Sequence, residues 1–87
     1  MISRASAPFW RRFRALPIHV QDQARQAFRR FREDPADPYL NFKKLKGHPG
    51  FWSVRISRDY RAVAVRDRDT LGWFWIGNHR AFDREFC

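Results

Sequence analysis

Arg55, Arg61 and His79 are the residues of this chain whose types are best suited to chemistry on a phosphate group. Arginine presents a rigid fork of N–H donors that matches phosphate oxygens, and histidine can gain or lose a proton near neutral pH. Together they could bind a phosphodiester and move a proton. Each also has a plainer interpretation, because an arginine on a strand is usually a solvated residue and a lone histidine near a strand end is usually structural.

A basic segment, residues 42–50, precedes these three residues and contains Lys43, Lys44 and Lys46. These lysines could contact a phosphate backbone, although an ordinary polar loop is an equally good interpretation. The chain has no glycine-rich phosphate loop, no set of metal ligands and no nucleophile beside a base. Its one cysteine is Cys87, so we expect no disulfide within the chain and no metal site built from several cysteines. We therefore expect neither a metal nor a cofactor.

Two helices are predicted in the first half of the chain, after a short strand at residues 2–5. Ser6 can cap the first helix, which Pro17 ends. Residues 18–33 form the second, and two prolines in residues 34–38 end it. The apolar residues that share one face at helical spacing are Phe9, Phe13 and Leu16 in the first helix and Val20, Ala24, Ala27, Phe28 and Phe31 in the second. The pattern predicts a helical hairpin.

Alternation of apolar and polar residues predicts strands in the second half. In residues 52–57, alternate positions are apolar, which would turn Trp52, Val54 and Ile56 toward the helices. Ser53, Arg55 and Ser57 would then face solvent, and Arg61 on the next strand, residues 60–66, could join them. Residues 71–77 are apolar on both faces and predict a central, covered strand. His79 would follow it at a sheet edge or in a loop.

These elements predict the fold. Short links between the three strands favour an antiparallel meander. We therefore predict one α+β domain over residues 1–87, in which the helical hairpin packs on an antiparallel sheet of three to four strands. Trp73 and Trp75 would lie in its core rather than serve as stacking platforms for bases.

Composition restricts the partners and the compartment. The chain has 87 residues, of which 44% are hydrophobic and 17% aromatic, too many for a disordered tail. Lys and Arg number 18 against 9 Asp and Glu, a net charge of +9 that favours a nucleic acid as the partner. All but three of these cations are Arg, which suits a polyanion but is also favoured by a GC-rich genome. No apolar run is long enough for a signal peptide or a membrane span, and we expect a cytoplasmic protein.

The sequence also resembles the RelE/ParE toxins of bacterial toxin–antitoxin systems. The resemblance rests on four segments followed by Phe82 and Asp83, and it covers most of the chain. The segments are Lys-Lys-Leu-Lys-Gly at 43–47, Phe-Trp-Ser-Val-Arg-Ile at 51–56, Asp-Tyr-Arg-Ala-Val at 59–63 and Trp-Phe-Trp-Ile-Gly-Asn-His at 73–79. The resemblance implies a compact sheet backed by a helical hairpin, in agreement with the pattern of the residues.

In ribosome-dependent members of that superfamily, residues on the sheet cleave mRNA in the ribosomal A site without a metal. The ribose 2′-hydroxyl attacks the adjacent phosphate, which leaves a 2′,3′-cyclic phosphate and a 5′-hydroxyl. The resemblance implies that Arg61 and Arg55 would stabilise the phosphate charge and that His79 would be a general acid or base. The remaining RNA contacts would be Lys43, Lys44, Lys46, Ser53 and Phe82.

The chain departs from the superfamily pattern in two places. Residues 42–50 lack the glutamate that acts as a base in one subgroup. Phe82 or Phe86 replaces a terminal tyrosine of several active members, so a ring that can stack on a base stands where a proton could be exchanged.

Three functions stay open from the sequence. The first is an mRNA endonuclease that acts on ribosomes and inhibits translation. The second is a ParE-like toxin that poisons DNA gyrase without hydrolysis, and the third is a nucleic-acid-binding domain with no toxicity. The position of His79 favours the first. The resemblance also implies an acidic, partly disordered antitoxin as a partner.

Overall fold

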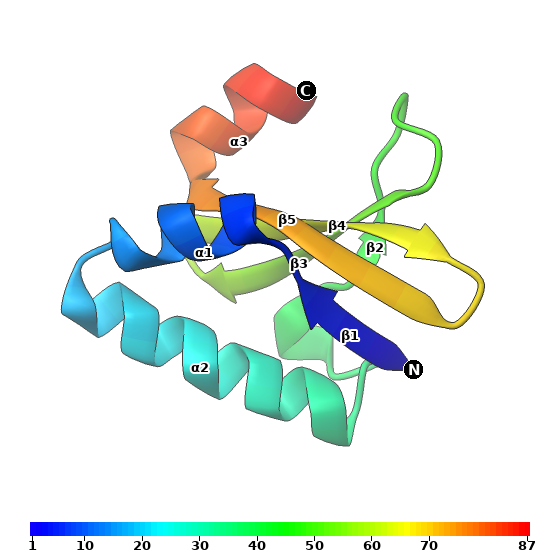
Figure 1. Cartoon of the computed structure of the whole chain (residues 1–87), viewed down its shortest axis with the longest axis horizontal. Coiled ribbons are helices and arrows are strands. Elements are labelled where there is room, and N and C mark those ends of the chain that lie inside the picture. Colours follow the sequence, from blue (N-terminus) through cyan, green and yellow to red (C-terminus); the bar gives the residue numbers. More distant parts are fainter.

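Two helices cover one face of a five-stranded sheet and a third helix covers the other face (Figure 1). The structure is a computed structural model that describes every residue of the chain, 1–87. Along the sequence the elements are β1 (Ile2–Ala5), α1 (Ala7–Arg14), α2 (Ile18–Glu33), the 3₁₀ turn η1 (Pro38–Leu40), β2 (Lys43–Lys44), β3 (Phe51–Ser57), β4 (Tyr60–Asp67), β5 (Thr70–Asn78) and α3 (His79–Phe86).

The strands lie in the order β1-β5-β4-β3-β2. The pairs from β5 through β2 are antiparallel, whereas β1 is parallel to β5. The predicted α+β fold with its helical hairpin is confirmed, but the sheet is mixed and has five strands rather than three to four. Lys43 and Lys44 form the extra edge strand, because they pair with Ser53 and Trp52 of β3.

The helical hairpin forms as its sequence predicts. The Ser6 hydroxyl accepts a hydrogen bond from the Phe9 N–H at 3.4 Å and so caps α1. Pro17 precedes α2, which buries Val20, Ala24, Ala27 and Phe31 along one face. None of the three helices is long and apolar enough to cross a lipid bilayer.

The main core lies between the hairpin and the sheet. Phe9 and Phe13 of α1 and Phe31 of α2 meet Trp73 and the other apolar residues that the strands turn to this side. The full set of buried residues is Phe9, Phe13, Ala24, Ala27, Phe31, Leu40, Val54, Ile56, Ala62, Ala64, Leu71, Trp73 and Ile76. Val54 and Ile56 therefore face the helices as the alternation predicts.

A second, smaller core lies on the opposite face of the sheet. It consists of Leu45, Val63, Trp75, Phe82 and Phe86. Its outer layer is α3, whose two phenylalanines stand four residues apart and so share one side of the helix. Trp75 belongs to this core and Trp73 to the main one, which bears out the prediction that both indoles are structural.

The predicted solvent exposure of Ser53 and Phe82 is wrong. Ser53 is 3% exposed and Phe82 is 7% exposed. The reason is α3, which covers this face of the sheet: the sequence pattern predicts no helix after residue 77 and places His79 at a sheet edge or in a loop. The Asn78 side chain caps the helix by accepting a hydrogen bond from the Ala81 N–H at 2.8 Å.

Candidate active site

Arg55 and Arg61 stand directly opposite one another on the β3–β4 hairpin. Side chains of directly opposed residues on adjacent strands are close neighbours, and like charges in that arrangement destabilise a sheet. Burial lowers the pKa of Arg61, and the positive charge of Arg55 lowers it further. An anion placed between the two guanidinium groups would relieve this repulsion, so the pair has the electrostatics of a phosphate-binding site.

Arg61 is held in place by the turn that it closes. Its Nη1 donates to the carbonyl oxygens of Ser57, Arg58 and Tyr60 at 2.8, 3.2 and 3.0 Å. Its Nε and Nη2 make no hydrogen bond within the protein. Arg61 therefore stabilises the turn of the hairpin, and its remaining N–H donors are free and held in a fixed position.

Arg55 leans toward the outer side of β3. Its Nε donates to the carbonyl oxygen of Tyr39 at 2.8 Å, and its guanidinium carbon lies 5.3 Å from the centre of the Tyr39 ring. Its two Nη atoms are not hydrogen-bonded within the protein. The guanidinium is thus anchored at one end and free at the other.

His79 is the first residue of α3 and not part of a loop. Its backbone N–H donates to the carbonyl oxygen of Asp59 at 2.6 Å, which ties the start of α3 to the β3–β4 turn. Its Nε2 lies 3.3 Å from Oδ2 of Asp83, one helical turn further on, and its side chain is half-exposed. The imidazole is therefore oriented by a carboxylate and open to solvent.

Asp83 links the histidine to the arginine pair. Its charge acts on Arg61 in the direction that raises the arginine pKa, opposite to the effect of burial. Sequence reasoning used Asp83 only as part of a motif and assigned it no role. The spacing of four residues between His79 and Asp83 would have revealed the pair if residues 79–86 had been predicted as a helix.

The three lysines do not share one face. Lys43 and Lys44 are neighbours on β2 and so point to opposite sides of the sheet. Lys44 lies on the side of the helical hairpin, with its Nζ 5.8 Å from the Trp52 ring centre. Burial and Asp83 raise the pKa of the Cys87 thiol while Lys43 acts in the opposite direction, which places Lys43 near the end of α3. Lys46 is exposed in the turn that follows β2.

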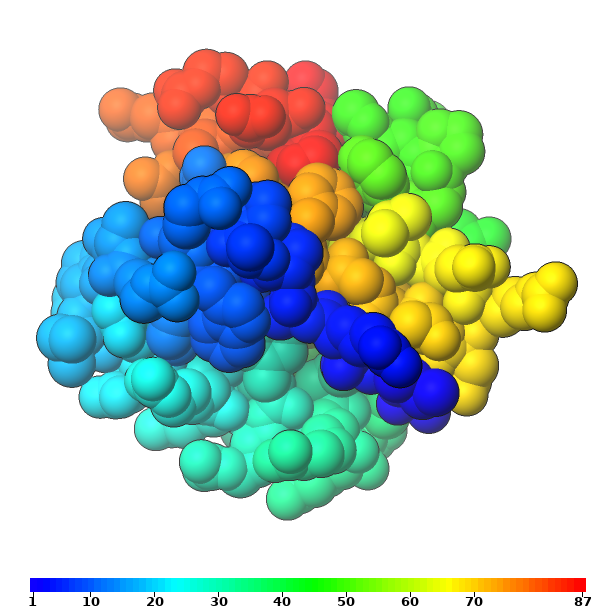
Figure 2. Space-filling view, viewed as in Figure 1, coloured from blue at the N-terminus to red at the C-terminus, as the bar shows by residue number.

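Residues around 45–50 meet the end of α3 above the sheet, as the green and red surfaces of Figure 2 show. The ring centres of His48 and Phe86 are 5.7 Å apart at this junction. Among the residues predicted for the site, Arg55 and Arg61 are cross-strand neighbours, and His79 follows the end of β5, two residues after the Gly77 that pairs with Arg61. No group of three or more His, Cys, Asp or Glu side chains lies close enough together to hold a metal ion.

Comparison with known protein families shows to which family this chain belongs. The family described as the ParE-like toxin domain matches residues 18–84. The chain belongs to this family. The match begins with α2 and ends within α3. It therefore includes every residue of the candidate site. No curated protein sequence matches the chain.

Solved toxin structures share the fold of this ParE-like domain. The RelB–RelE antitoxin–toxin complex from Methanococcus jannaschii contains a chain that is 15% identical, with a TM-score of 0.75 and coverage of 97% of this chain and 99% of that one. The YoeB/ParE toxin from Agrobacterium tumefaciens is 18% identical, with a TM-score of 0.66 and coverage of 91% and 99%. The isolated Escherichia coli RelE toxin is 18% identical, with a TM-score of 0.65 and coverage of 97% of each chain. The resemblance to the RelE/ParE superfamily is confirmed.

Proposed function

We propose that this ParE-like protein is the toxin of a toxin–antitoxin pair and that it cleaves mRNA on the ribosome without a metal. The observation that carries the proposal is the position of His79. Its half-exposed imidazole lies 3.3 Å from Asp83, a carboxylate whose charge acts on Arg61, and Arg61 is paired with Arg55, which like it has free N–H donors. These groups supply the cations and one of the two proton-transfer groups that transfer of a phosphodiester to a 2′-hydroxyl requires. Because translating ribosomes are in the cytoplasm, the protein would act there.

In the proposed reaction the ribose 2′-oxygen forms a bond to phosphorus as the bond to the 5′-oxygen breaks. Negative charge grows on the phosphate oxygens in the transition state, where Arg61 and Arg55 can donate hydrogen bonds to them. With its Nε2 toward Asp83, His79 has Nδ1 available either to accept the 2′-hydroxyl proton or to donate one to the leaving 5′-oxygen, and water at this exposed position takes up or supplies the other proton. The products are a 2′,3′-cyclic phosphate and a 5′-hydroxyl.

His79 is the one histidine of the proposed site, and the two terminal phenylalanines do not add a second proton-transfer group. Phe82 and Phe86 are buried in the second core, so they cannot reach a substrate from their positions in α3. Lys43, on the same side of the sheet, supplies a further cation for the RNA backbone.

An acidic antitoxin is the proposed restraining partner. The solved Methanococcus jannaschii chain is in a RelB–RelE antitoxin–toxin complex, and this chain has a similar fold. A net charge of +9 would attract an acidic protein as well as RNA. Binding of such a partner over Arg55 and Arg61 would keep the toxin inactive.

A ParE-like poison of DNA gyrase is the second candidate. The matching family is described as ParE-like, and the triple hydrogen bond from Arg61 Nη1 gives that arginine a structural explanation that needs no chemistry. This alternative uses the basic surface for binding and assigns no proton transfer to His79.

Brief induction of the wild-type protein in bacteria separates the two candidates. Mapping of RNA 5′ ends should show new ends within translated messages for the wild type and far fewer for His79→Gln. If messages stay intact while gyrase–DNA complexes accumulate, the gyrase candidate replaces the nuclease.

A further inference from the structure

Tyr39, in η1, lies beside two arginines that come from different elements. The guanidinium carbon of Arg30, from α2, is 4.9 Å from the centre of its ring, and that of Arg55, from β3, is 5.3 Å away. The Tyr39 residue is 44% exposed. We call Arg30, Tyr39 and Arg55 the Tyr39 cluster.

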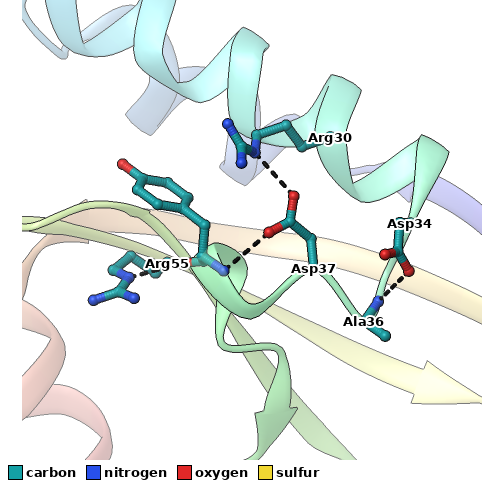
Figure 3. A network of polar contacts seen from close by, with 6 residues as sticks. Arg30, Asp34, Ala36, Asp37 and Arg55 are labelled. Atoms are coloured by element: carbon teal, nitrogen blue, oxygen red, sulfur yellow. Dashed lines mark hydrogen bonds and ion pairs between the residues drawn. The ribbon is translucent and has the colours of Figure 1, made fainter.

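The cluster is built rather than accidental, because each of its members is fixed by a polar bond. The Arg30 Nε donates to Oδ2 of Asp37 at 3.0 Å, and the Tyr39 N–H donates to Oδ1 of the same carboxylate at 3.0 Å, as Figure 3 shows. The Arg55 Nε donates to the Tyr39 carbonyl oxygen at 2.8 Å. Asp37 thereby orients η1 and one of the two guanidinium groups.

The free donors of the cluster face solvent. Both arginines use Nε within the protein, and their Nη atoms make no hydrogen bond there. The side chain of Arg30 is 53% exposed, whereas that of Asp37 is 21% exposed, so the cation lies further outward than the carboxylate that holds it. Two guanidinium groups against one carboxylate leave the cluster with a net positive charge.

The cluster continues the arginine pair of the candidate active site. Arg55 belongs to both groups, since it stands opposite Arg61 on the hairpin and touches Tyr39 at the outer side of β3. A line of cations therefore runs from β4 across β3 to α2. Proteins that bind single strands use such basic tracks with interleaved aromatic rings to follow the backbone.

We propose that the Tyr39 cluster binds the phosphate backbone of single-stranded RNA beyond the proposed cleavage site. The inference rests on the proposed function for the identity of the strand. Arg30 and Arg55 contact successive parts of the backbone, and the Tyr39 ring acts as the spacer that keeps the two guanidinium groups in place. Arg30 and Tyr39 contribute to binding and take no part in proton transfer.

The test measures binding of a fluorescein-labelled, 12-nucleotide 2′-O-methyl RNA, which cannot be cleaved by attack of a 2′-hydroxyl. Arg30→Gln should weaken binding about fivefold and reduce the magnitude of the slope of log K against log salt by about 0.7. Arg29→Gln is the matched control: it removes the same charge from the next residue of α2, which has no polar partner, and should bind within about twofold of wild type. Tyr39→Leu removes the ring and should also weaken RNA binding. Tyr39→Phe keeps the ring and should bind the RNA as the wild type does.

Equal losses for Arg30→Gln and Arg29→Gln would overturn the proposal, because general charge would then explain the binding. It also fails if Arg30→Gln weakens binding of a ten-residue oligoglutamate peptide but not of the RNA, since the cluster would then suit an acidic protein. The readout does not depend on cleavage. A protein that cuts no message on ribosomes but loses RNA affinity selectively at Arg30 would refute the nuclease and support the Tyr39 cluster.

Discussion

Arg61 couples the folding of the β3–β4 hairpin to the proposed chemistry. Three carbonyl oxygens of the turn accept hydrogen bonds from its Nη1, while its other nitrogens remain available to a phosphate. An arginine that only stabilised a transition state would be dispensable for folding. The three hydrogen bonds indicate that this one also contributes to stability.

Arg61→Ala should therefore reduce both stability and cleavage. Loss of the turn bonds should cost about 1 kcal/mol in the free energy of unfolding, which lowers the Tm by about 5 °C. Loss of charge stabilisation should cost about 3 kcal/mol in the cleavage barrier, a decrease of about a hundredfold in rate. Thermal denaturation and single-turnover cleavage measure the two effects. A large loss of stability with unchanged cleavage by the folded fraction would leave Arg61 with a structural role only.

Asp37 predicts a specific dependence of stability on pH. The Tyr39 N–H and then Arg30 lower the pKa of this carboxyl below its ordinary value of 3.8. A carboxyl whose pKa is lower in the folded protein stabilises the fold above its unfolded pKa, and this contribution is lost as the pH falls through the folded value. Asp37→Ala should thus be less stable than wild type at pH 7, and the difference should shrink as the pH falls below 3.8.

Urea denaturation of both proteins across this pH range measures the effect. Asp67→Ala removes an exposed carboxylate that makes no hydrogen bond, and it should show no such trend. A difference between Asp37→Ala and wild type that stays constant down to the lowest pH would contradict the assignment.

Among the elements, α3 determines which face of the sheet is accessible. Phe82 and Phe86 attach it to the second core, Asn78 caps it, and the His79 N–H anchors its start to Asp59. The same helix orients His79 toward Asp83. Packing of α3 therefore positions the imidazole of the proposed site.

Phe86→Ala should loosen α3 and disturb the site together. Phe86 is 8% exposed, so its removal should cost about 3 kcal/mol in the free energy of unfolding. Arg84→Ala, on the exposed side of the same helix, should change stability by less than about 0.5 kcal/mol. Chemical denaturation compares the two, and amide exchange in residues 79–86 should rise only for Phe86→Ala. Equal stability of the two variants would mean that α3 does not hold the second core.

The hairpin was predictable because its apolar residues keep helical spacing. The long strands were predictable because residues 52–57 alternate between apolar and polar types and residues 71–77 form a continuous apolar run. Two of the short elements, β2 and α3, were not. β2 has two residues, both lysines, and it exists because β3 offers it an edge. α3 has eight residues, mostly polar, and its two phenylalanines acquire meaning only once the sheet beneath them is known. Burial of Ser53 and Phe82 followed from that helix, so two of the predicted RNA contacts were misplaced.

At the scale of the whole molecule, several of the arginines are concentrated at the candidate site and along the surface next to it. Arg55 and Arg61 are opposed without a carboxylate between them, and Arg30 extends their line across the surface. The chain tolerates this repulsion at a surface that a polyanion can cover. RNA and an acidic antitoxin would compete for the same surface, which is how a partner would restrain the toxin.

Cleavage of a message on purified, programmed ribosomes tests the central claim most directly. Wild-type protein should produce fragments with a 2′,3′-cyclic phosphate at one new end and a 5′-hydroxyl at the other, because the attacking group is the 2′-hydroxyl. His79→Gln should remain folded and slow this cleavage by about 10²- to 10⁴-fold. Intact messages with folded wild-type protein, or equal cleavage by His79→Gln, would contradict the assignment of Arg61, Arg55 and His79 to one RNA-cleaving site.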